Sequence, residues 1–235
     1  MVLKEIERIK NSAPDVDIGF SPVACGVGMP ALQPAEQSPE RAATAIILVT
    51  RHTRLMTLQN YTEAAFEQVL CDTKERSRNV MAGIIKLLKD NEVAYCLPQA
   101  AQTDETGLRA PFSYKFGAVN AGLGWIGKNG VLVSKRFGPR VRLDAVIAVL
   151  PAAKAGEASG PVTQSSCPPE CVACVAACPY QALKNKLWQY DTRREELIDY
   201  RLCNQKRSAM LRLKNRKSAC GLCMVSCPMG IKAGC

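Results

Sequence analysis

Nine of the chain's 12 cysteines fall at or after residue 167, and seven of these nine form two runs that repeat one spacing. The first run reads Cys167-Pro-Pro-Glu-Cys171-Val-Ala-Cys174-Val-Ala-Ala-Cys178-Pro179. The second reads Cys220-Gly-Leu-Cys223-Met-Val-Ser-Cys227-Pro228. Both end in C-x2-C-x3-C-P, the run that wraps a cubane [4Fe–4S] cluster, because a tight loop lets thiolates reach three corners of one cube. The spacing therefore predicts two such clusters.

The number of thiols matches this interpretation. Two cubanes need eight thiolates, and Cys203, which stands alone before the second run, completes the set. The cysteine before each proline is expected to ligate the other run's cluster. The predicted ligands are Cys167, Cys171, Cys174 and Cys227 for cluster one, and Cys178, Cys203, Cys220 and Cys223 for cluster two. The Pro-Pro-Glu gap after Cys167 has three residues where the commonest bacterial run has two.

Other uses of the cysteines fit less well. Structural zinc also takes paired C-x2-C knuckles, but it does not call for a third cysteine followed by proline in both runs. A disulfide scaffold would be short and secreted. We expect free or buried thiols at the remaining positions, Cys25, Cys71, Cys96 and Cys235. His52 is the only histidine, which excludes multi-histidine metal sites and catalysis, and we expect it to be a surface or satisfied side chain.

The composition is that of a globular protein. The 235 residues are 47% hydrophobic and 22% charged, which excludes wholesale disorder and collagen-like repeats. The longest apolar runs, Ala42–Thr50 and Ala145–Ala153, are shorter than the roughly 20 residues of a membrane span. The N-terminus is charged from residue 4 and lacks the apolar stretch of a secretory signal. We expect a soluble, cytoplasmic protein with no membrane contact.

The chain is basic, with a formal net charge of +10. Two clusters, each of about −2 with its thiolates, would reduce this to about +6. Arg201–Lys217 concentrates positive charge without an acid, in Arg201, Lys206, Arg207, Arg212, Lys214, Arg216 and Lys217. This stretch could bind nucleic acid, dock an acidic electron donor such as flavodoxin or ferredoxin, or compensate cluster charge. Because it has no aromatics for base stacking, compensation with donor docking is favoured over RNA.

Ala121–Gly130 is glycine-rich and imitates two nucleotide-binding motifs. Gly122, Gly124 and Gly127 match G-x-G-x-x-G, but a helical pattern precedes them and a strand pattern follows, which reverses the dinucleotide-binding order. The segment nearly spells a P-loop, but Asn129 replaces its Ser or Thr. Closely spaced glycines would let the backbone approach a large ligand, and a plain turn is the alternative.

The order of these motifs resembles a known family. Ala121–Lys128, a short strand, Phe137–Arg142, a further strand and the double-cubane module are similar to epoxyqueuosine reductases. Asn129-Gly130 and Gly138–Arg142 also resemble corrinoid reductive dehalogenases. The resemblance covers residues 105–230. It implies a nitroreductase-like domain that holds a base-off cobalamin, with electrons passing from clusters to cobalt. The cofactor contacts it implies are Gly122, Gly124, Trp125, Gly127, Lys128, Asn129 and Gly130.

The resemblance also suggests catalytic residues. Epoxyqueuosine reductases carry Asp-x-x-Pro-x-x-Glu-Arg, whose Asp is the proposed proton donor. Aligned on Pro111, the Asp position holds Leu108, and the Glu-Arg pair becomes Tyr114-Lys115. Reductive dehalogenases use a Tyr near a Lys or Arg as proton donor, so Tyr114 and Lys115 are the catalytic candidates, with an exposed helical Tyr-Lys pair as the alternative. The acid is missing from this sequence, and so are the C-terminal helical repeats that many of those enzymes use on tRNA. Epoxyqueuosine-tRNA is therefore expected to be a disfavoured substrate.

Three functions follow. The leading one is a cobalamin-dependent iron–sulfur reductase that passes electrons to a small-molecule or modified-base substrate. The second is a ferredoxin-like electron-transfer protein that serves a partner and holds no corrinoid. The third replaces cobalamin with FMN, which the nitroreductase-like fold also binds.

The elements that must position these motifs indicate an α+β fold. Met1–Lys10 is typical of an amphipathic helix, Ala42–Val49 of a buried strand, and Tyr61–Lys89 of one long helix or two. Glu92–Leu97 predicts a second strand. Val131–Ser134 and Val141–Leu150 predict a strand pair joined by a turn at Phe137–Pro139.

Ala152–Ser166 is small, polar and without periodicity, as a linker would be. We therefore place one boundary near residue 155. Residues 1–155 would form the nitroreductase-like, cobalamin-binding domain, and residues 156–235 a small bacterial-type 2x[4Fe–4S] ferredoxin-like domain.

Overall fold

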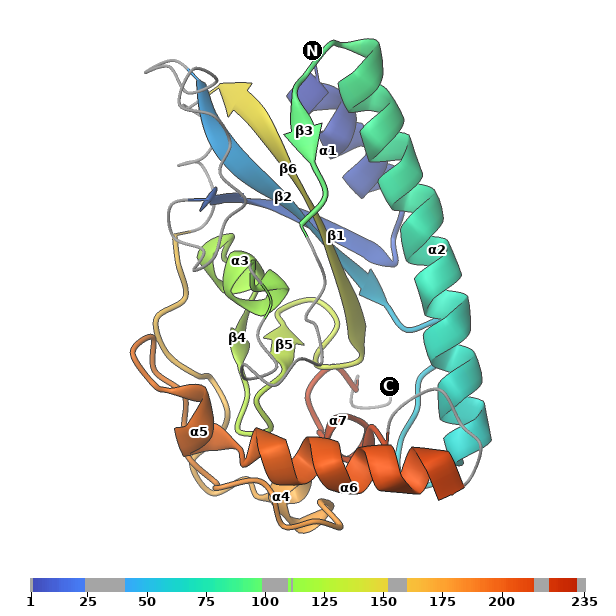
Figure 1. Ribbon diagram of the computed structural model, residues 1–235, viewed down its shortest axis with the longest axis vertical. Coiled ribbons are helices and arrows are strands. Elements are labelled where there is room, and N and C mark those ends of the chain that lie inside the picture. Colours follow the sequence, from blue (N-terminus) through green and yellow to red (C-terminus); the bar gives the residue numbers. More distant parts are fainter. Residues whose placement is uncertain are drawn as a thin grey trace. The chain divides into compact units, whose positions relative to one another are not determined.

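The computed structural model describes residues 2–23, 41–98, 110, 112–151, 160–213 and 220–231. Several residues singled out by sequence lie outside these ranges: Cys25, Leu108, Pro111, Lys214, Arg216, Lys217 and Cys235. The chain forms two compact units that alternate along the sequence (Figure 1). Unit 1 comprises residues 1–50, 76–123 and 142–161, and unit 2 comprises residues 51–75, 124–141 and 162–235. The sequence predicts one boundary near residue 155, whereas the structure draws two earlier segments into the cysteine-rich unit.

Unit 1 is built on a four-stranded sheet in the order β1-β2-β6-β3. Its strands are β1 (Val16–Pro22), β2 (Arg41–Arg51), β6 (Val141–Pro151) and β3 (Tyr95–Cys96). β1 pairs with β2 in antiparallel fashion, from Val16 opposite Thr50 to Pro22 opposite Thr44. β3 pairs antiparallel with β6. The central strands β2 and β6 hold uninterrupted buried runs, which branched apolar residues on a two-sided sheet favour.

Helices cover both faces of this sheet. On one face, α1 (Val2–Ser12) and the unit 1 part of α2 (Glu63–Asp90) supply Ile6, Ile84 and Leu88 to a core that includes Ile46 and Leu48. Ile47 points the other way, because successive side chains of a strand alternate between faces. There α3 (Tyr114–Asn120) packs so closely that a Cβ on Gly117 would lie 2.7 Å from the Ile47 Cδ1 atom. Unit 1 is thus a helix–sheet–helix arrangement.

The predicted elements of unit 1 are largely confirmed. The Met1–Lys10 pattern forms α1, Ala42–Val49 lies within β2, and Tyr61–Lys89 forms the single helix α2. The strand expected at Glu92–Leu97 is only two residues long, since Glu92 adopts a left-handed turn with φ of 53°. The strand β1 has no counterpart among the predicted elements.

The predicted strand pair is wrong. β5 (Leu132–Ser134) pairs with β4 (Gly124–Ile126) in unit 2, and β6 belongs to the large sheet of unit 1. The turn between β5 and β6 is closed locally by an isolated bridge between Ser134 and Gly138. The two strands therefore take different partners although they are adjacent in sequence.

Unit 2 contains four further helices, three of which carry one cysteine each. They are α4 (Ala173–Ala176), α5 (Arg194–Leu197), α6 (Tyr200–Leu213) and α7 (Leu222–Val225). Segment 51–75 belongs to this unit because Met56, Phe66 and Val69 form an apolar cluster with Val225 of α7. Segment 124–141 belongs to it because its side chains hydrogen-bond to the cysteine loops.

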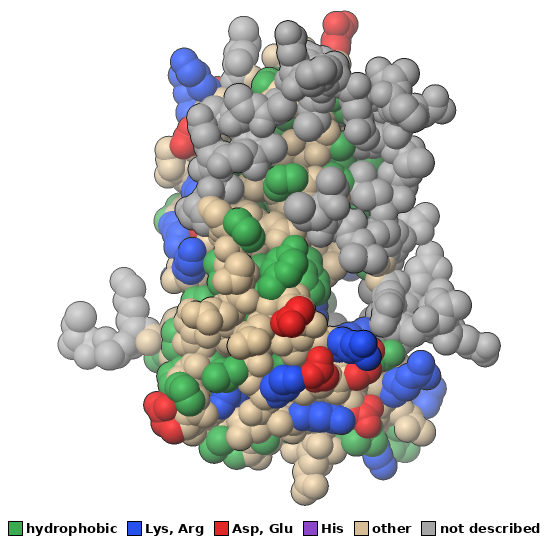
Figure 2. Space-filling model, turned by 90° about the vertical axis from the view of Figure 1, so that its left-hand side faces the viewer, with side chains coloured by type: hydrophobic (Ala, Val, Ile, Leu, Met, Phe, Trp, Pro, Cys, Tyr) green, Lys and Arg blue, Asp and Glu red, His purple; other side chains and the backbone are tan. Residues whose placement is uncertain are grey.

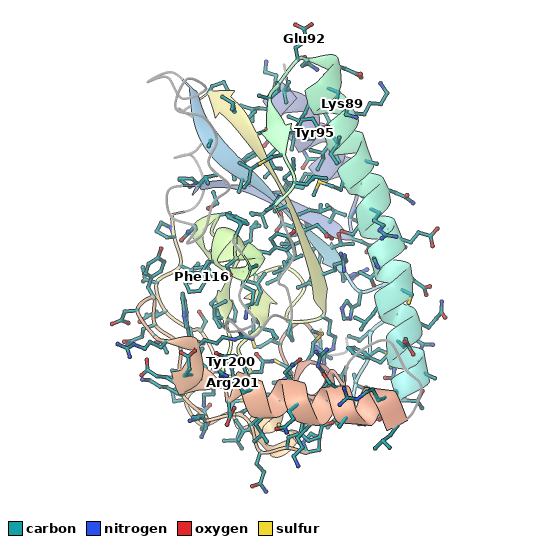
Figure 3. All side chains as sticks on the ribbon, in the orientation of Figure 1. Lys89, Glu92, Tyr95, Phe116, Tyr200 and Arg201 are labelled. Atoms are coloured by element: carbon teal, nitrogen blue, oxygen red, sulfur yellow. The ribbon has the colours of Figure 1, made fainter. Side chains whose placement is uncertain are left out.

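The junction of α5 and α6 is held by a stacked cation. The Arg194 guanidinium lies 3.9 Å from the ring centroid of Tyr200, the first residue of α6, and Arg201 follows it (Figure 3). The face of the molecule that carries α5 mixes basic and acidic side chains (Figure 2), including the ion pair of Lys186 with Glu196. The charge on this face is therefore of both signs. Among the described residues, no helix is both long enough and apolar enough to span a membrane.

Candidate metal centre

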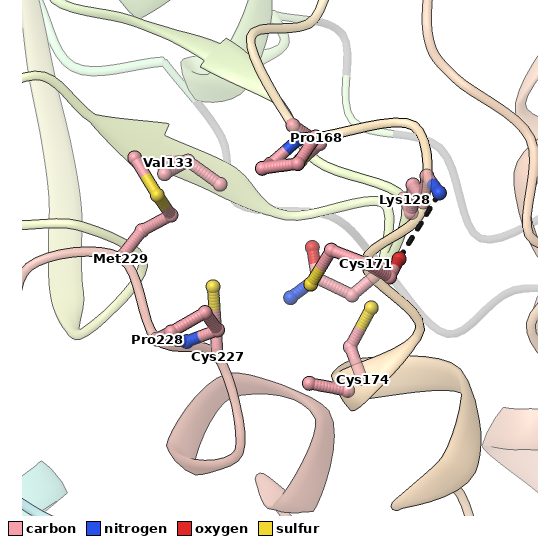
Figure 4. Close-up of a pocket in the computed structure, with 11 residues that line it drawn as sticks. Lys128, Val133, Pro168, Cys171, Cys174, Cys227, Pro228 and Met229 are labelled. Atoms are coloured by element: carbon pink, nitrogen blue, oxygen red, sulfur yellow. Dashed lines mark hydrogen bonds between the residues drawn. The ribbon is translucent and has the colours of Figure 1, made fainter.

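Four thiols that the sequence assigns to cluster one line a single pocket of unit 2. Cys167, Cys171, Cys174 and Cys227 all line this pocket. In Figure 4 the sulfur atoms of Cys171, Cys174 and Cys227 point into it. The rest of the lining is mostly apolar, with Lys128 and Asn129 at its edge: Val133, Pro168, Ala173, Pro228 and Met229. The structure thus brings a cysteine of the second run together with three of the first.

The two cysteine runs fold alike. In the first, Cys174 lies in the one-turn helix α4, and the Cys178 N–H donates to the Val175 carbonyl just beyond it. In the second, Cys223 lies in α7, and the Cys227 N–H donates to the Met224 carbonyl. α4 and α7 lie against each other. The repeated C-x2-C-x3-C-P spacing therefore produces a repeated loop structure.

The four thiols assigned to cluster two form a second group. The pKa of the Cys223 thiol is raised to about 12, first by burial and then by nearby Cys220 and Cys203. The pKa of Cys203, on α6, is raised by burial and then by Cys178. Such mutual effects require that the thiols lie close together. Cys178, from the first run, thus joins Cys203, Cys220 and Cys223.

Similar effects link the thiols around the pocket, and one of these thiols, Cys174, also raises the pKa of Cys223. The pKa of Cys174 is raised to about 11, first by burial and then by Cys227, Cys167 and Cys171. The principal thiol neighbour of Cys227 is Cys167. Each run therefore contributes the cysteine that stands just before its proline to the other group, as the crossed ligation of two cubanes requires. We refer below to set one (Cys167, Cys171, Cys174, Cys227) and set two (Cys178, Cys203, Cys220, Cys223).

The donor set fits clusters better than single ions. Within the ranges that the structure describes, no three His, Cys, Asp or Glu side chains converge closely enough to chelate one metal ion. The set one thiols instead ring a space whose walls are apolar. Four thiols around such a space match a cubane, which offers one iron at each of four corners. Cys71 is exposed in the unit 2 part of α2, and Cys96 is half-buried in β3 of unit 1, so both lie outside the two groups.

Lys128 fixes the loop that carries the first run. Its ammonium group donates to the carbonyl oxygens of Pro169 (2.7 Å) and Cys171 (3.0 Å) and to the Asn185 Oδ1 atom (3.0 Å). Lys128 is only 2% exposed, and three acceptors use all three of its donors. The adjacent Asn129 donates from Nδ2 to the Cys223 carbonyl oxygen at 3.0 Å. This pair therefore supports one ligand-bearing loop of each run.

Arg140 fixes the loop that carries Cys227. Its guanidinium donates to the carbonyl oxygens of Val225 (2.7 Å), Cys227 (2.8 Å) and Met229 (3.0 Å), and to Met56 (2.6 Å). This arginine is fully buried. Burial lowers its pKa, and nearby Cys227 opposes that change. The sequence analysis missed this role, although an arginine directly after Gly-Pro at the start of an apolar strand was a signal of a buried cation.

The glycine-rich segment packs against protein in the described structure. A Cβ on Gly124 would overlap the Val133 carbonyl oxygen of β5, and one on Gly127 would lie 2.7 Å from the Asn129 Oδ1 atom. Gly122 and Gly130 both have positive φ. Trp125 is buried, and its Nε1 atom has no hydrogen-bond partner within the described structure. The glycines thus serve the β4–β5 hairpin, and the polar groups of Lys128 and Asn129 hold cysteine loops.

The two catalytic candidates open helix α3 of unit 1. The Tyr114 hydroxyl donates to the Pro98 carbonyl oxygen at 3.1 Å. Burial, and then the Asp144 carboxylate, raise the Tyr114 pKa above 10, so the phenol keeps its proton at neutral pH. Tyr114 and Lys115 are both half-buried, which differs from the exposed pair considered as the alternative.

Asp144 connects Tyr114 to a polar network that sequence reasoning missed. The Arg142 guanidinium makes two hydrogen bonds to the Asp144 carboxylate, at 2.7 and 2.9 Å. The buried Ser77 hydroxyl also donates to Asp144 at 2.6 Å. Ser77 lies on α2, far away in sequence, so only the fold reveals this group.

Comparison with known proteins places the fold. No family model matches the chain. Over 123 residues the chain is 30% identical to the epoxyqueuosine reductase of Leadbetterella byssophila, a match that covers 51% of this chain and 37% of that protein. A crystal structure of epoxyqueuosine reductase with an epoxyqueuosine-modified tRNA-Tyr stem loop matches 98% of this chain with a TM-score of 0.57 and 17% identity. The chain has the fold of epoxyqueuosine reductase.

Other solved structures agree. The enzyme from Streptococcus thermophilus matches with a TM-score of 0.51 and 20% identity, and that from Bacillus subtilis with 0.52 and 15%. The chain covers 66% of each of these solved chains. The resemblance to epoxyqueuosine reductases is thus supported, and the mixed α+β fold is that of their structures. None of these relatives is a reductive dehalogenase, so the second resemblance gains no support from them.

Proposed function

We propose that this chain is an iron–sulfur oxidoreductase that holds two [4Fe–4S] clusters and passes their electrons one at a time to a substrate. The observation that carries the proposal is the gathering of eight cysteines into two sets of four, each containing one cysteine from the other run. The relatives by sequence and by structure are reductases by name. When bound, the clusters supply one-electron redox chemistry; the protein supplies thiolate ligands and fixed loops.

The residues around the thiols have definite tasks in this function. Lys128 and Arg140 fix the loops through the carbonyls of Cys171 and Cys227, and their positive charges oppose the negative charge of ligated thiolates. The apolar wall of the set one pocket excludes water from that side. Buried surroundings and hydrogen bonds are the means by which proteins set cluster potentials.

Anaerobic reconstitution tests the proposal. We expect the purified chain, treated with iron and sulfide, to show the absorption and reduced-state EPR signals of [4Fe–4S] clusters. A Cys223→Ser variant should lose part of this signal. The matched control is Cys71→Ser, which changes an exposed cysteine outside both sets and should leave the signal intact. Zinc without iron in the purified protein, or equal spectra for both variants, would contradict the proposal.

The proposed substrate is a modified base in RNA. The solved relative with the highest TM-score quoted above was crystallised with a modified tRNA stem loop, and this chain matches that fold over almost its whole length. The basic residues Arg201, Lys206 and Arg207 on α6 would bind phosphates in this proposal. The small-molecule substrate favoured by the sequence is the competing possibility. An epoxyqueuosine-containing stem loop should bind, and its affinity should fall steeply as salt is added. If a queuosine-free duplex does not bind, this result would favour RNA as the substrate.

Cobalamin as the final electron carrier rests on the family resemblance alone. Apart from Trp125, the residues assigned to contact it offer no free side-chain group among the described residues, because Lys128 and Asn129 hold cysteine loops and β5 fills the space at Gly124. The proposed function therefore includes neither a corrinoid nor FMN. Titration of the reconstituted chain with cobalamin tests this part: a base-off spectrum supports a corrinoid site, and an unchanged spectrum favours a ferredoxin-like electron-transfer protein.

A variant is also needed to locate any corrinoid site, and Gly124→Val is unsuitable for this purpose. A branched side chain there would collide with β5 whether or not a corrinoid binds. Trp125→Phe is the better variant, because it removes the partnerless Nε1 donor and keeps an aromatic ring in the buried site. Weaker cobalamin binding with unchanged iron content would place the corrinoid at this segment.

A further inference from the structure

Two buried cations lie beside set one. Lys128 and Arg140 are each 2% exposed. Lys128 donates to the carbonyl oxygen of Cys171 at 3.0 Å, and Arg140 donates to that of Cys227 at 2.8 Å. Neither side chain forms an ion pair with a carboxylate of the described residues. The structure therefore buries two positive charges whose hydrogen-bond partners are all neutral.

Such burial needs a compensating anion. An ammonium or guanidinium group removed from water loses much of its hydration, and neutral carbonyls replace only part of it. Lys128 lines the pocket of the four set one thiols, and Arg140 lies beside Cys227, so thiolates that ligate iron would place negative charge near both cations. On the proposed function, on which this inference rests, the ligated cluster is the anion that these two cations compensate.

Among residues 160–213 and 220–231, no cation as deeply buried as Lys128 or Arg140 is bonded to a carbonyl oxygen of a set two cysteine. The carbonyl oxygen of Cys223 accepts from the neutral amide of Asn129, and that of Cys220 accepts from the Tyr61 hydroxyl at 2.5 Å. The charged groups that act on its thiols are the half-exposed Arg207, the exposed Arg194 and the acid Glu63. Solvent screens exposed charges, and the acid acts in the opposite direction. The electrostatic surroundings of the two sets therefore differ.

We propose that Lys128 and Arg140 are positioning residues that raise the reduction potential of the set one cluster above that of the set two cluster. Reduction adds one negative charge to a cluster, and a nearby buried cation stabilises that charge. Burial of the thiols acts against reduction, but the same burial removes the screening of Lys128 and Arg140 and so strengthens their attraction. The excess of buried positive charge beside set one decides the order.

The consequence is a direction for electron flow within unit 2. The thiolates of set one and set two would each hold a cluster that supplies one-electron chemistry between its 2+ and 1+ states. An electron received from a one-electron donor protein would pass from the cluster held by set two to the cluster held by set one, with no bond or proton exchanged. The residues of set one would therefore hold the electron on the substrate side.

A redox titration monitored by EPR tests this assignment on the full, anaerobically reconstituted chain. Lys128→Gln keeps a hydrogen-bond donor and removes the charge, and Lys128→Arg keeps the charge. We expect two midpoint potentials in the wild type. The higher should fall in Lys128→Gln by a tenfold change in the reduction equilibrium, about 59 mV for one electron, and should stay in place in Lys128→Arg. Lys135→Gln, which neutralises an exposed lysine of the same segment, is the matched control and should move neither potential.

Iron content is measured first for every variant. If Lys128→Gln binds less iron than the wild type, the pair Arg140→Gln and Arg140→Lys is titrated in its place, with the same expected contrast. A fall in the lower potential, equal shifts in the charge-removing and charge-keeping variants, or no shift at all would overturn the inference. A wild type that binds no clusters would contradict the proposed function itself, which keeps the two failures distinguishable.

Discussion

At the residue scale, local spacing predicted the thiols and their grouping, because a cubane imposes its geometry on nearby cysteines. The side chains that support them could not be predicted in the same way. Lys128 and Arg140 come many residues before the loops that they hold. Their neighbours in sequence, Gly-Lys-Asn and Gly-Pro-Arg, do not indicate that the side chains bind carbonyl oxygens of Cys171 and Cys227. Lys128 was predicted to contact a corrinoid, because a lysine among glycines is compatible both with a cofactor contact and with a bond to another loop.

His52 is a second residue whose surroundings only the fold supplies. Neither imidazole nitrogen has a hydrogen-bond partner within the described structure, and the ring lies edge-on to Phe66 at 6.0 Å. Burial, and then the Arg140 charge, lower its pKa from 6.5 to about 4. The expected surface or satisfied histidine is therefore wrong, since His52 is buried and unbonded among these residues.

The low pKa of His52 predicts a loss of stability in acid. Between pH 6.5 and 4 the unfolded chain takes up a proton that the folded chain does not, so the folded state loses stability as the pH falls. At pH 5.5 the loss should be about 1 kcal/mol relative to pH 8. Urea midpoints of the reconstituted wild type and His52→Leu measure this difference, and the variant should lose less on acidification. Equal losses in both proteins would show that His52 does not titrate in this way.

A single ligand should control a single cluster. Cys203 belongs to set two through Cys178 and Cys220, so Cys203→Ser should damage that cluster and leave the set one signals visible by EPR. Cys96→Ser, at a half-buried cysteine of β3 outside both sets, is the control and should preserve both clusters. Equal loss of both clusters in Cys203→Ser would count against the grouping of the thiols.

At the element scale, long apolar runs were the most predictable. The buried run of β2 and the helical periodicity of α2 each span many residues, so neighbours in sequence were enough to define them. Short elements were not predictable. β5 and β6 look like a hairpin because a glycine turn separates them, yet β5 pairs with β4 and β6 enters the large sheet. Three-residue strands carry too little pattern to specify which partner they take.

The turn before α7 makes a further prediction. Gly221 has a φ of +63°, and a Cβ there would overlap the ring of the buried Phe66. Gly221→Ala should therefore cost more than the ~1 kcal/mol of a left-handed residue alone, and should reduce the iron bound by set two, whose Cys220 and Cys223 flank this turn. Thermal unfolding and iron analysis of the reconstituted variant measure both effects.

Gly83→Ala is the matched control for that experiment. Gly83 is exposed in the middle of α2, and a Cβ there meets nothing within 4 Å. Alanine should stabilise the helix by about 0.5–1 kcal/mol and leave iron binding unchanged. If Gly221→Ala behaved like Gly83→Ala, the close approach of this turn to Phe66 would be refuted.

At the scale of the whole molecule, the chain does not divide where its composition changes. The linker-like stretch before residue 160 suggested one boundary, but two earlier segments belong to the cysteine-rich unit. Phe66 and Arg140 explain this, because both make their main contacts with residues around Val225. Contacts between segments distant in sequence do not change the local composition. The composition of the linker therefore could not predict that these two segments belong to the cysteine-rich unit.

The two units should differ in their dependence on metal. Unit 1 has a continuous core of sheet and helices, including Ile46, Ile84 and Val146. Unit 2 buries Lys128 and Arg140 beside thiols that need iron to become a compensating anion. Removing iron with a chelator under anaerobic conditions should therefore raise hydrogen exchange in α4, α7 and the β4–β5 hairpin, and leave β2 and β6 protected. Uniform loss of protection across both units would contradict this division.

The central claim is that two sets of four thiols each hold a [4Fe–4S] cluster, and the most direct measurement is iron and sulfide per chain combined with Mössbauer spectroscopy of ⁵⁷Fe-reconstituted protein. We predict about eight iron and eight sulfide per chain, all in [4Fe–4S] environments. The Cys227→Ser variant, which changes the cysteine just before Pro228, should retain about four of each. Zinc at about two per chain in place of iron, or iron only as isolated tetrathiolate sites, would contradict the account.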